Sequence, residues 1–294
     1  MTHLPLITGS GGRLGRALTQ VIEEEHAPEF PGAVFATRDE IDVTDYFRMR
    51  SEMERIEPTV VVNCAAMTAV DLCEDEPARA AAINVEGARL VARAARVTGA
   101  RVIHISTDQV FDGRQAGAPR PYREDDPTRP LSVYATSKLQ GEAAVASENP
   151  DHAILRSAWF FGPHPAEAFP ERYLSALAAG ETIRIVSDRI GSPTYLKDLA
   201  RAIVALIRAP FTGVMHFGSA GEPTSRYHVV RELALRLGMD TQRLVAIPSS
   251  DWSGDRATRP LYSALDCGLY ARVTGRSPRT WLACLDEYIA ERNG

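Results

Sequence analysis

Short apolar runs alternate with segments of helical periodicity through the first half of the chain. Their lengths suit strands, and continuous rather than alternating hydrophobicity is typical of strands that are covered on both faces. The pattern therefore predicts an α/β fold built on a Rossmann-like, doubly wound parallel sheet. The runs are LPLITG, AVFAT, TVVVNCAA, RVIHIST and HAILRSA, at residues 4–9, 33–37, 59–66, 101–107 and 152–158.

Two connecting segments have contrasting compositions. Residues 74–98 are rich in alanine and are followed by Gly99, which predicts one long crossover helix with a glycine cap. Residues 111–133 are crowded with glycine, proline and charge, and loops of that length inside a compact domain are often functional.

The alternation becomes less regular after about residue 160. We expect a dinucleotide-binding domain at 1–160, later segments around 190–220 that rejoin it, and a smaller α/β substrate-binding lobe at 161–294. The candidate elements of this second half are helices and strands at 170–180, 182–187, 195–209 and 214–219.

Composition limits the function classes. The chain has 294 residues, of which 45% are hydrophobic and 24% charged, and its formal net charge is -5. Because no block of basic residues occurs, neither a nucleic acid nor an anionic membrane is the expected partner. A small molecule is expected instead.

Cysteine usage and apolar run length indicate the compartment. The four cysteines are scattered without a CxxC spacing, and no apolar stretch approaches membrane-spanning length. The N-terminal residues lack the pattern of a secretory signal. We therefore expect a cytoplasmic protein with reduced thiols. The seven histidines form no ligand spacing, so no catalytic metal is predicted.

A glycine motif follows the first predicted strand and opens the first predicted helix. Gly9, Gly12 and Gly15, with Arg13 and Leu14 between them, fit a turn that brings backbone N–H groups close to a pyrophosphate. An ordinary glycine-rich turn is the alternative, but its position between strand and helix favours dinucleotide binding.

The end of the second strand bears on cofactor choice. Arg38 suits the 2′-phosphate of NADP(H), whereas Asp39 would suit the ribose of NAD(H). We expect NADP(H) to be preferred, with NAD(H) as the alternative. Further residues expected along the cofactor are Asp42 and Val43 near the adenine, and Ala65, Ala66 and Thr68 after the third strand.

Three polar residues are candidates for catalysis. Tyr134 and Lys138 are four residues apart in a predicted helix, so they share one face. A nearby ammonium would stabilise the phenolate and lower the tyrosine pKa. Thr107 ends the fourth strand, where hydroxyls point into the ligand crevice. An exposed Tyr–Lys pair and a strand-capping threonine are the alternatives.

The whole chain resembles the extended short-chain dehydrogenase/reductases and, within them, the dTDP-4-dehydrorhamnose reductase family. The order and spacing of the motifs carry the resemblance over some 260 residues. These motifs include TGSGGRLGRAL, VVNCAAMTAVDLCEDEP, INVEGARLVARAA, VIHISTDQVFDG, YREDDPTRPLSVYATSKLQGE, ILRSAWFFG, IVSDRIGSPTYLKDLA and RPLYSALD.

The resemblance implies NADPH-dependent reduction of the C4 keto group of a nucleotide-activated 6-deoxy sugar. The family default is conversion of dTDP-4-dehydro-L-rhamnose to dTDP-L-rhamnose, a step of dTDP-rhamnose biosynthesis. Tyr134 matches the proton donor, Lys138 the lysine that binds the nicotinamide ribose, and Thr107 the hydroxyl of the triad. The positions that match substrate contacts are Asp108, Trp159 and Arg259, the last near the diphosphate.

Several positions depart from the family pattern. Gln109 and Ala135 replace a usual tyrosine and glycine, residues 163–173 lack the usual Gly-x-Asn-Phe segment, and Asp188 is followed by Arg189 where glutamine is usual. These changes lie near the hexose, so another 4-keto sugar nucleotide stays open as the substrate.

Two other function classes stay open. The chain also resembles the regulatory β-subunit of methionine adenosyltransferase, which would bind the cofactor without reducing a sugar. A nucleotide-sugar epimerase or dehydratase is the other class, although Gln109 leaves no glutamate for the general base of a dehydratase. The family resemblance also allows a homodimer.

Overall fold

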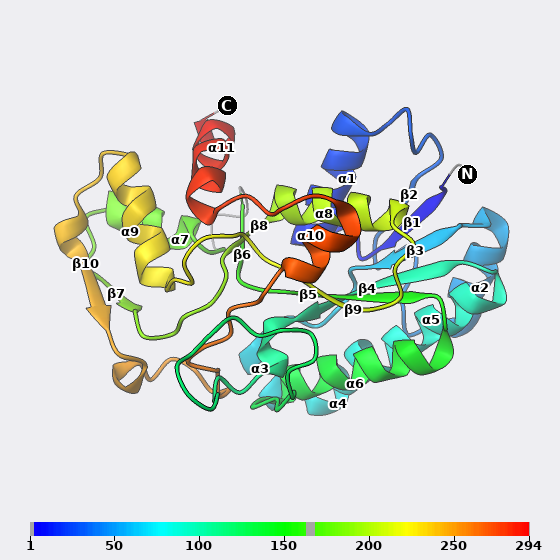
Figure 1. Cartoon of the computed structure of the whole chain (residues 1–294), viewed down its shortest axis with the longest axis horizontal. Helices are drawn as coiled ribbons and strands as arrows, with labels where there is room; N and C mark the ends of the chain where they lie inside the picture. Colours follow the sequence, from blue (N-terminus) through cyan, green and yellow to red (C-terminus); the bar gives the residue numbers. More distant parts are fainter. Residues whose placement is uncertain (1–2, 163–167, 294) are drawn as a thin grey trace.

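A six-stranded parallel sheet forms the centre of the molecule. The computed structural model describes residues 3–162 and 168–293. The strand order is β2-β1-β3-β4-β5-β9, and helices cover both faces (Figure 1), which confirms the expected fold class. The strands are β1 (Pro5–Thr8), β2 (Val34–Ala36), β3 (Val60–Asn63), β4 (Arg101–Thr107), β5 (His152–Ser157) and β9 (Gly213–Phe217).

Successive strand residues point to opposite faces, so the sheet has two apolar cores. Ile7 and Val62 pack with α1 and α8, whereas their neighbours Leu6 and Val61 pack with α2 and α5. This two-sided burial explains why the strands are continuous apolar runs. The helices are α1 (Arg13–Glu25), α8 (Leu196–Arg208) and α10 (Gly268–Thr274) on the first face, and α2 (Tyr46–Ile56), α5 (Ala88–Val97) and α6 (Val133–Glu148) on the second.

The crossover between β3 and β4 differs from the expected single helix over 74–98. A short helix ends before Glu76, whose φ of -122° and ψ of 57° are not helical. Pro77 lacks an N–H and disfavours helical backbone at the residue before it, so the next helix begins at Pro77. Gly99 has the positive φ expected of the cap. The pieces are α3 (Val70–Asp75), α4 (Pro77–Ala81), a π-helical turn η1 (Ala82–Gly87) and α5.

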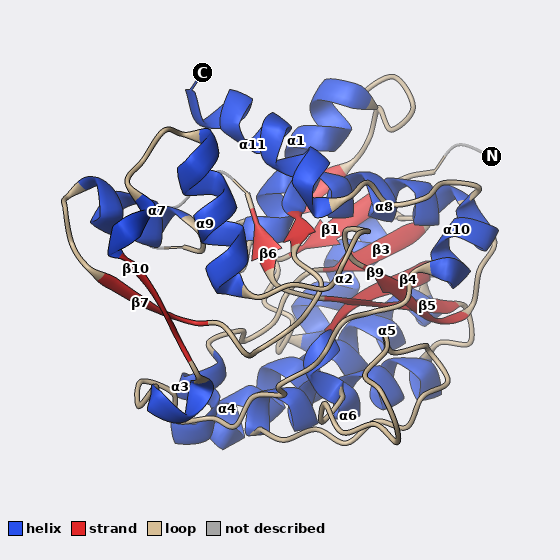
Figure 2. Cartoon of the chain, turned by 60° about the vertical axis from the view of Figure 1, so that its left-hand side comes forward, coloured by secondary structure: helices blue, strands red, loops and turns tan. Residues whose placement is uncertain are grey.

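A smaller lobe lies at the carboxyl ends of the strands (Figure 2). Its core brings together apolar residues of α7, α9, α11, β7 and β10, and its two strands are parallel. The segment 214–219 forms β9 beside β5, so it lies in the main sheet. The domain boundaries stay a prediction. The lobe elements are α7 (Glu171–Ala178), β7 (Ile183–Val186), α9 (Arg226–Arg236), β10 (Leu244–Ile247) and α11 (Trp281–Asn293), with the pair β6 (Phe160–Phe161) and β8 (Thr194–Tyr195) nearby.

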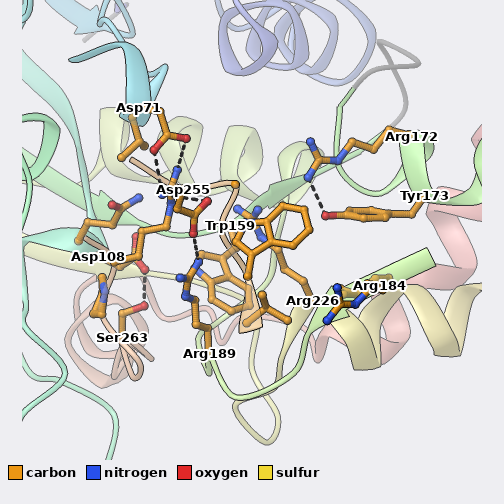
Figure 3. Close-up of a pocket in the computed structure, with 18 residues that line it drawn as sticks. Asp71, Asp108, Trp159, Arg172, Tyr173, Arg184, Arg189, Arg226, Asp255 and Ser263 are labelled. Carbon is orange, nitrogen blue, oxygen red and sulfur yellow. Dashed lines mark hydrogen bonds and ion pairs between the residues drawn. The ribbon is translucent and has the colours of Figure 1, made fainter. Parts of the chain in front are cut away.

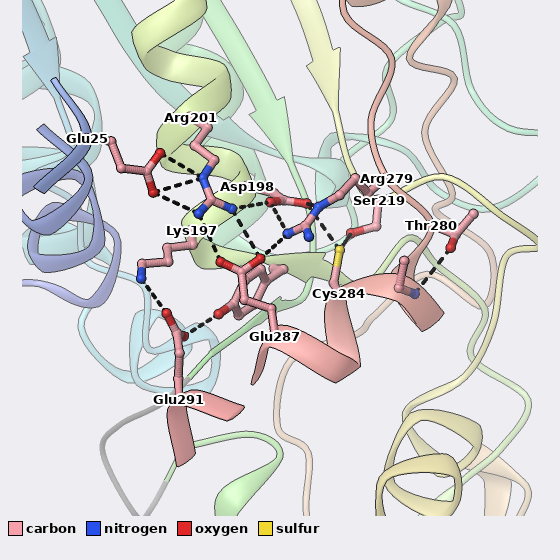
Figure 4. Close-up of polar contacts among 12 residues, drawn as sticks. Glu25, Lys197, Asp198, Arg201, Ser219, Arg279, Thr280, Cys284, Glu287 and Glu291 are labelled. Carbon is pink, nitrogen blue, oxygen red and sulfur yellow. Dashed lines mark hydrogen bonds and ion pairs between the residues drawn. The ribbon is translucent and has the colours of Figure 1, made fainter. Parts of the chain in front are cut away.

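Ion pairs join the last helix to the main sheet's helices (Figure 4). Arg201 of α8 donates to Glu25 of α1 at 2.7 Å and to Glu287 of α11 at 2.9 Å. Arg279 donates to Asp198 Oδ2 at 2.9 Å and also pairs with Glu287. Helix α11 is therefore fixed against α1 and α8 by interlinked charges rather than by isolated pairs.

The remaining regular elements are short 3₁₀ turns at Asp108–Val110 (η2), Thr241–Arg243 (η3) and Ser249–Asp251 (η4). Within residues 3–162 and 168–293, each helix is too short or too polar to cross a membrane.

Candidate active site

Two connected cavities open where the strands of the main sheet end. The inner cavity is lined by the turn after β1, the ends of β4 and β5, and the start of α6. The outer pocket is lined by loops and by residues of the smaller lobe. Because some side chains line both, the two form one crevice. The shared residues are Val70, Asp108, Gln109, Trp159 and Arg226.

The glycine motif forms a tight turn at the N-terminus of α1. Gly9 has a φ of 71°, and a Cβ there would lie 2.7 Å from the Ala65 nitrogen. A Cβ at Gly15 would overlap the Gly9 carbonyl oxygen, so both positions require glycine. Gly12 begins α1 without a side-chain cap, and the first turn of α1 contains no acidic residue. This helix end suits a phosphate group.

Arg13 and Leu14 lie between these glycines, and both line the inner cavity. Leu14 is buried in the core beneath α1. The Arg13 guanidinium donates to the carbonyl oxygens of Phe160 and Phe169 at 3.3 and 3.4 Å. Arg13 therefore links the glycine turn to the segment that leads into the smaller lobe.

A side cavity next to the glycine turn holds the residues expected near the adenosine. Arg38 lines this cavity and its Nε lies 3.3 Å from Asp42 Oδ2, whereas Asp39 is not among the lining residues. The cavity wall thus presents a guanidinium, which favours a 2′-phosphate. Thr68 lines the inner cavity instead. The other predicted residues of the side cavity are Asp42, Val43, Ala65 and Ala66.

Thr107, Tyr134 and Lys138 line the inner cavity together. Thr107 is the last residue of β4, while Tyr134 and Lys138 come from the first turns of α6. Their exposed fractions are 4%, 8% and 2%. Ser132 caps α6 by accepting from the Ala135 N–H at 3.1 Å. The cap fixes where the helix begins and therefore which face carries the tyrosine and the lysine.

The expected lowering of the tyrosine pKa by the lysine is wrong for this structure. Burial raises the pKa of Tyr134, because a phenolate is poorly stabilised away from water. Burial also lowers the pKa of Lys138, to about 8. The lysine ammonium points to the sheet, where it donates to the Ile105 carbonyl at 2.7 Å. The phenol therefore keeps its proton firmly in this state.

Asp108 lies between the two cavities and is buried. Its carboxylate accepts from the Thr107 hydroxyl at 3.1 Å and from the Ser263 hydroxyl at 2.5 Å. Burial raises the pKa of Asp108 to about 6, although both hydroxyls oppose that change. Thr107 also accepts from the Gln109 N–H at 3.2 Å, so it does cap a turn as well as line the cavity.

The indole of Trp159 lines both cavities, and Figure 3 shows it among the residues of the outer pocket. Its backbone has a φ of 46°. A Cβ at position 191 would lie 2.8 Å from the indole, so Gly191 provides the space for this ring. The glycine of the Asp188–Thr194 segment is thus explained by packing against Trp159.

The outer pocket is rich in arginine (Figure 3). Arg259 pairs with Asp71 at 2.8 Å and with Asp255 at 3.0 Å, and Arg189 also pairs with Asp255. The Arg259 guanidinium lowers the pKa of Asp71 to about 2. Five arginines line the pocket beside three aspartates, so its walls carry an excess of positive charge. The remaining three arginines are Arg172, Arg184 and Arg226.

Sequence reasoning missed Arg226, the first residue of α9. Its guanidinium lies over the rings of Trp159 and Phe169, at 5.4 and 5.3 Å from their centroids. Within the described part of the chain Arg226 makes no ion pair, and its side chain is exposed to solvent in the crevice. The only sequence signal is its place after Ser225, a typical helix cap, which says nothing about the cavity.

The positions that depart from the family pattern fall in different places. Gln109 lines both cavities, and its side-chain oxygen is buried without a partner among the described residues. Ala135 is buried within α6. Residues 163–167 lie outside the described residues, whereas Arg172 and Tyr173 line the outer pocket.

Comparisons with known proteins show the family of this chain. The family model described as "RmlD substrate binding domain" matches residues 4–293. The chain is 40% identical to a dTDP-4-dehydrorhamnose reductase of Mycobacterium tuberculosis, with 97% of this chain and 92% of the relative covered. It is 37% identical to a dTDP-4-keto-6-deoxy-D-glucose reductase of Streptomyces niveus, with 98% and 96% covered.

A solved structure is similar over the full length. This is the dTDP-4-dehydrorhamnose reductase of Bacillus anthracis in complex with NADP, which is 30% identical. The TM-score is 0.91, and the match covers 99% of this chain and all of the other.

Proposed function

Since this chain belongs to the RmlD substrate binding domain family, we propose that it reduces the C4 keto group of a nucleotide-activated 6-deoxy sugar with NADPH. The conversion of dTDP-4-dehydro-L-rhamnose to dTDP-L-rhamnose is the proposed reaction. One observation carries the proposal. Thr107, Tyr134 and Lys138 line a cavity that continues directly into an arginine-rich pocket.

The cavities fit a dinucleotide in our proposal. The uncapped start of α1 and the glycine turn would hold the pyrophosphate, and Arg38 would hold the 2′-phosphate. When bound, the nicotinamide supplies the hydride. Lys138 would donate to the nicotinamide ribose from the floor of the inner cavity. The preference for NADP(H) is supported by Arg38, and NAD(H) is the weaker alternative.

Tyr134 is the proposed acid. It would donate the phenolic proton to the C4 oxygen as the keto carbon is reduced, while the Thr107 hydroxyl would donate a hydrogen bond to the same oxygen. A raised tyrosine pKa suits this direction of reaction, because the acid must still hold its proton when the substrate arrives. In its protonated form, Lys138 would then stabilise the phenolate.

The outer pocket is the proposed site of the sugar nucleotide. A nucleoside diphosphate sugar carries negative charge on its diphosphate, and the surplus guanidinium charge of the pocket is complementary to it. Arg226 is the best placed of these groups, because it lies at the junction with the inner cavity. Arg259 is already paired with Asp71 and Asp255, so we assign it a supporting role.

Three residues near Tyr134 are proposed to contact the sugar. Asp108 and Trp159 line both cavities, as does Gln109. The buried Gln109 oxygen without a described partner would accept from a sugar hydroxyl, since buried polar atoms are rarely left unpaired. A glutamine at this position also disfavours the dehydratase alternative, which would need a carboxylate there.

The decisive experiment follows the loss of NADPH absorbance when the protein is mixed with dTDP-4-dehydro-L-rhamnose. NADH is run in parallel, and Tyr134→Phe is the control. Turnover that disappears in the control supports the proposal. Tight NADPH binding without turnover of this or another 4-keto sugar nucleotide would contradict it, and would favour the regulatory-subunit alternative.

A further inference from the structure

A chain of buried polar side chains crosses the sheet beneath Lys138. It runs from Thr8 of β1 through Asn63 of β3 and His104 of β4 to Lys138 of α6. The Thr8 hydroxyl donates to Asn63 Oδ1 at 2.9 Å, Asn63 Nδ2 lies 3.2 Å from His104 Nδ1, and His104 Nε2 lies 3.3 Å from Lys138 Nζ. None of the first three residues lines the inner cavity. Their contact with the inner cavity therefore runs through the lysine.

A backbone donor fixes the orientation of the Asn63 amide. The Ala65 N–H donates to Asn63 Oδ1 at 3.1 Å, and a backbone N–H has no lone pair to offer in return. The asparagine oxygen must face Ala65, so its NH₂ group must face His104. His104 Nδ1 is therefore the acceptor of this hydrogen bond.

This hydrogen bond determines the tautomer of the His104 ring. Burial holds the pKa of His104 well below its ordinary value, so the ring is neutral. A neutral imidazole has one N–H, and Nδ1 is already the acceptor. The proton must lie on Nε2, which faces the lysine.

We propose that His104 is a positioning residue that presents an N–H, rather than a lone pair, to the Lys138 amine and thereby favours the unprotonated form of that amine. The lysine Nζ then accepts from His104 and donates to the Ile105 carbonyl. This proposal deepens the proposed function and rests on it, because it concerns the lysine of that active site. It assigns the histidine no contact with substrate or cofactor.

The other titratable groups around Lys138 do not explain such an effect. Glu142, one turn along α6, favours the charged amine, but its carboxylate is shared with Arg156 at 2.7 Å. Burial raises the pKa of the Cys64 thiol, which follows β3, to about 12, so it is uncharged. Tyr134 is likewise protonated. His104 is thus the neighbour whose hydrogen-bond polarity decides between the two forms of the lysine.

The test compares His104→Asn with Thr8→Val. Asparagine keeps an acceptor where Nδ1 lies but leaves no group at the Nε2 position. The alkaline limb of the kcat–pH profile and the ¹³Cε titration of Lys138 should both move up by about one pH unit, which is the scale of one hydrogen bond. Thr8→Val removes a hydroxyl from the same chain of side chains but keeps the Ala65 N–H bond that orients the Asn63 amide. It should therefore lower the stability of the protein without moving either titration.

Two results would overturn the inference. One is an unchanged Lys138 titration in His104→Asn, and the other is an equal shift in Thr8→Val, which would indicate a general structural effect. A ¹⁵N spectrum of the unliganded wild-type protein tests the tautomer directly, and an Nδ1–H ring would also refute the inference. Since the spectrum and the lysine titration need no turnover, failure of the proposed function would be recognised separately.

Discussion

The inner cavity and the outer pocket hold their polar side chains in different ways. In the inner cavity, Thr107, Tyr134 and Lys138 are almost fully buried and are placed by a strand end and a capped helix. In the outer pocket, the long side chains of Arg189 and Arg259 come from loops and are held by ion pairs with aspartates. Secondary structure therefore positions the side chains of the inner cavity, whereas ion pairs position side chains of the outer pocket.

This difference suits two separate tasks. Proton transfer needs a donor held within hydrogen-bond reach of the reacting oxygen, and secondary structure supplies that accuracy. Binding of a charged, extended substrate tolerates some adjustment, which long side chains on loops provide. We therefore expect changes in the inner cavity to reduce kcat and changes in the outer pocket to raise KM.

The largest expected effect is that of Tyr134→Phe. Removing the phenolic hydroxyl deletes the proposed proton donor but keeps the ring, so kcat should fall by roughly 10²–10⁴-fold, the usual contribution of a general acid. The KM for the sugar nucleotide should change little. Steady-state kinetics give both values. Tyr46→Phe, at a partly buried tyrosine of α2 that lines neither the inner cavity nor the outer pocket, is the control and should leave kcat unchanged.

If Tyr134→Phe retains most of its activity while its thermal unfolding is also unchanged, another group donates the proton. The contrast between the two regions would then no longer hold.

The next largest expected effect is the change with pH in the contribution that Asp108 makes to the free energy of unfolding. Burial raises the pKa of this carboxyl from 3.8 to about 6, so the folded protein binds the proton more tightly than the unfolded chain. The contribution of Asp108 to the free energy of unfolding should therefore fall as pH rises from about 4 to about 6, and stay level above that. Two pKa units correspond to about 3 kcal/mol.

Denaturant unfolding of the wild type and of Asp108→Asn, at pH values from 4 to 8, measures this contribution. The stability difference between the two proteins should grow through this window in favour of the asparagine variant. A constant difference would mean that Asp108 is as well solvated in the folded protein as in the unfolded chain. Water would then reach Asp108, between the two cavities, more easily than its burial indicates.

Arg226→Gln tests the outer pocket. A hydrogen bond to a charged group contributes about 1.5–3 kcal/mol, so loss of this guanidinium should raise the KM for the sugar nucleotide by roughly 10- to 100-fold. The matched control is Arg231→Gln on the exposed surface of the same helix. A fall in kcat with an unchanged KM would place Arg226 with the catalytic groups instead.

The same contrast explains what the sequence could predict. Each of the first five apolar runs became a strand, because burial on both faces leaves a pattern that needs no knowledge of distant residues. Thr107, Tyr134 and Lys138 became candidates because strand ends and helix faces follow from local pattern, and the family resemblance implied that they share one site. The glycine turn followed in the same way.

The outer pocket could not be predicted in this way. Asp71 and Arg259 are 188 residues apart, and only the folded chain shows that they pair. Arg226 belongs to no motif, and only the folded chain shows that its guanidinium lies over the Trp159 ring. The break at Glu76 was missed because helix-forming residues lie on both sides of Pro77, although the proline itself was a signal.

The smallest expected effect concerns Arg38, a charged group at the solvent edge of the cofactor site. Its side chain is 68% exposed, so its interaction with a 2′-phosphate is partly screened by water and salt. Arg38→Ala should therefore raise the KM for NADPH by only about 10-fold, a change of about 1.4 kcal/mol, and leave the KM for NADH nearly unchanged. Arg50→Ala, which removes an exposed guanidinium of α2 outside the side cavity, is the control. An equal rise in the KM values for NADPH and NADH would show that Arg38 shapes the adenosine site through its contact with Asp42. Arg38 would then not act by binding the 2′-phosphate. Backbone would then position this end of the cofactor as well, and charge-based recognition would be confined to the outer pocket.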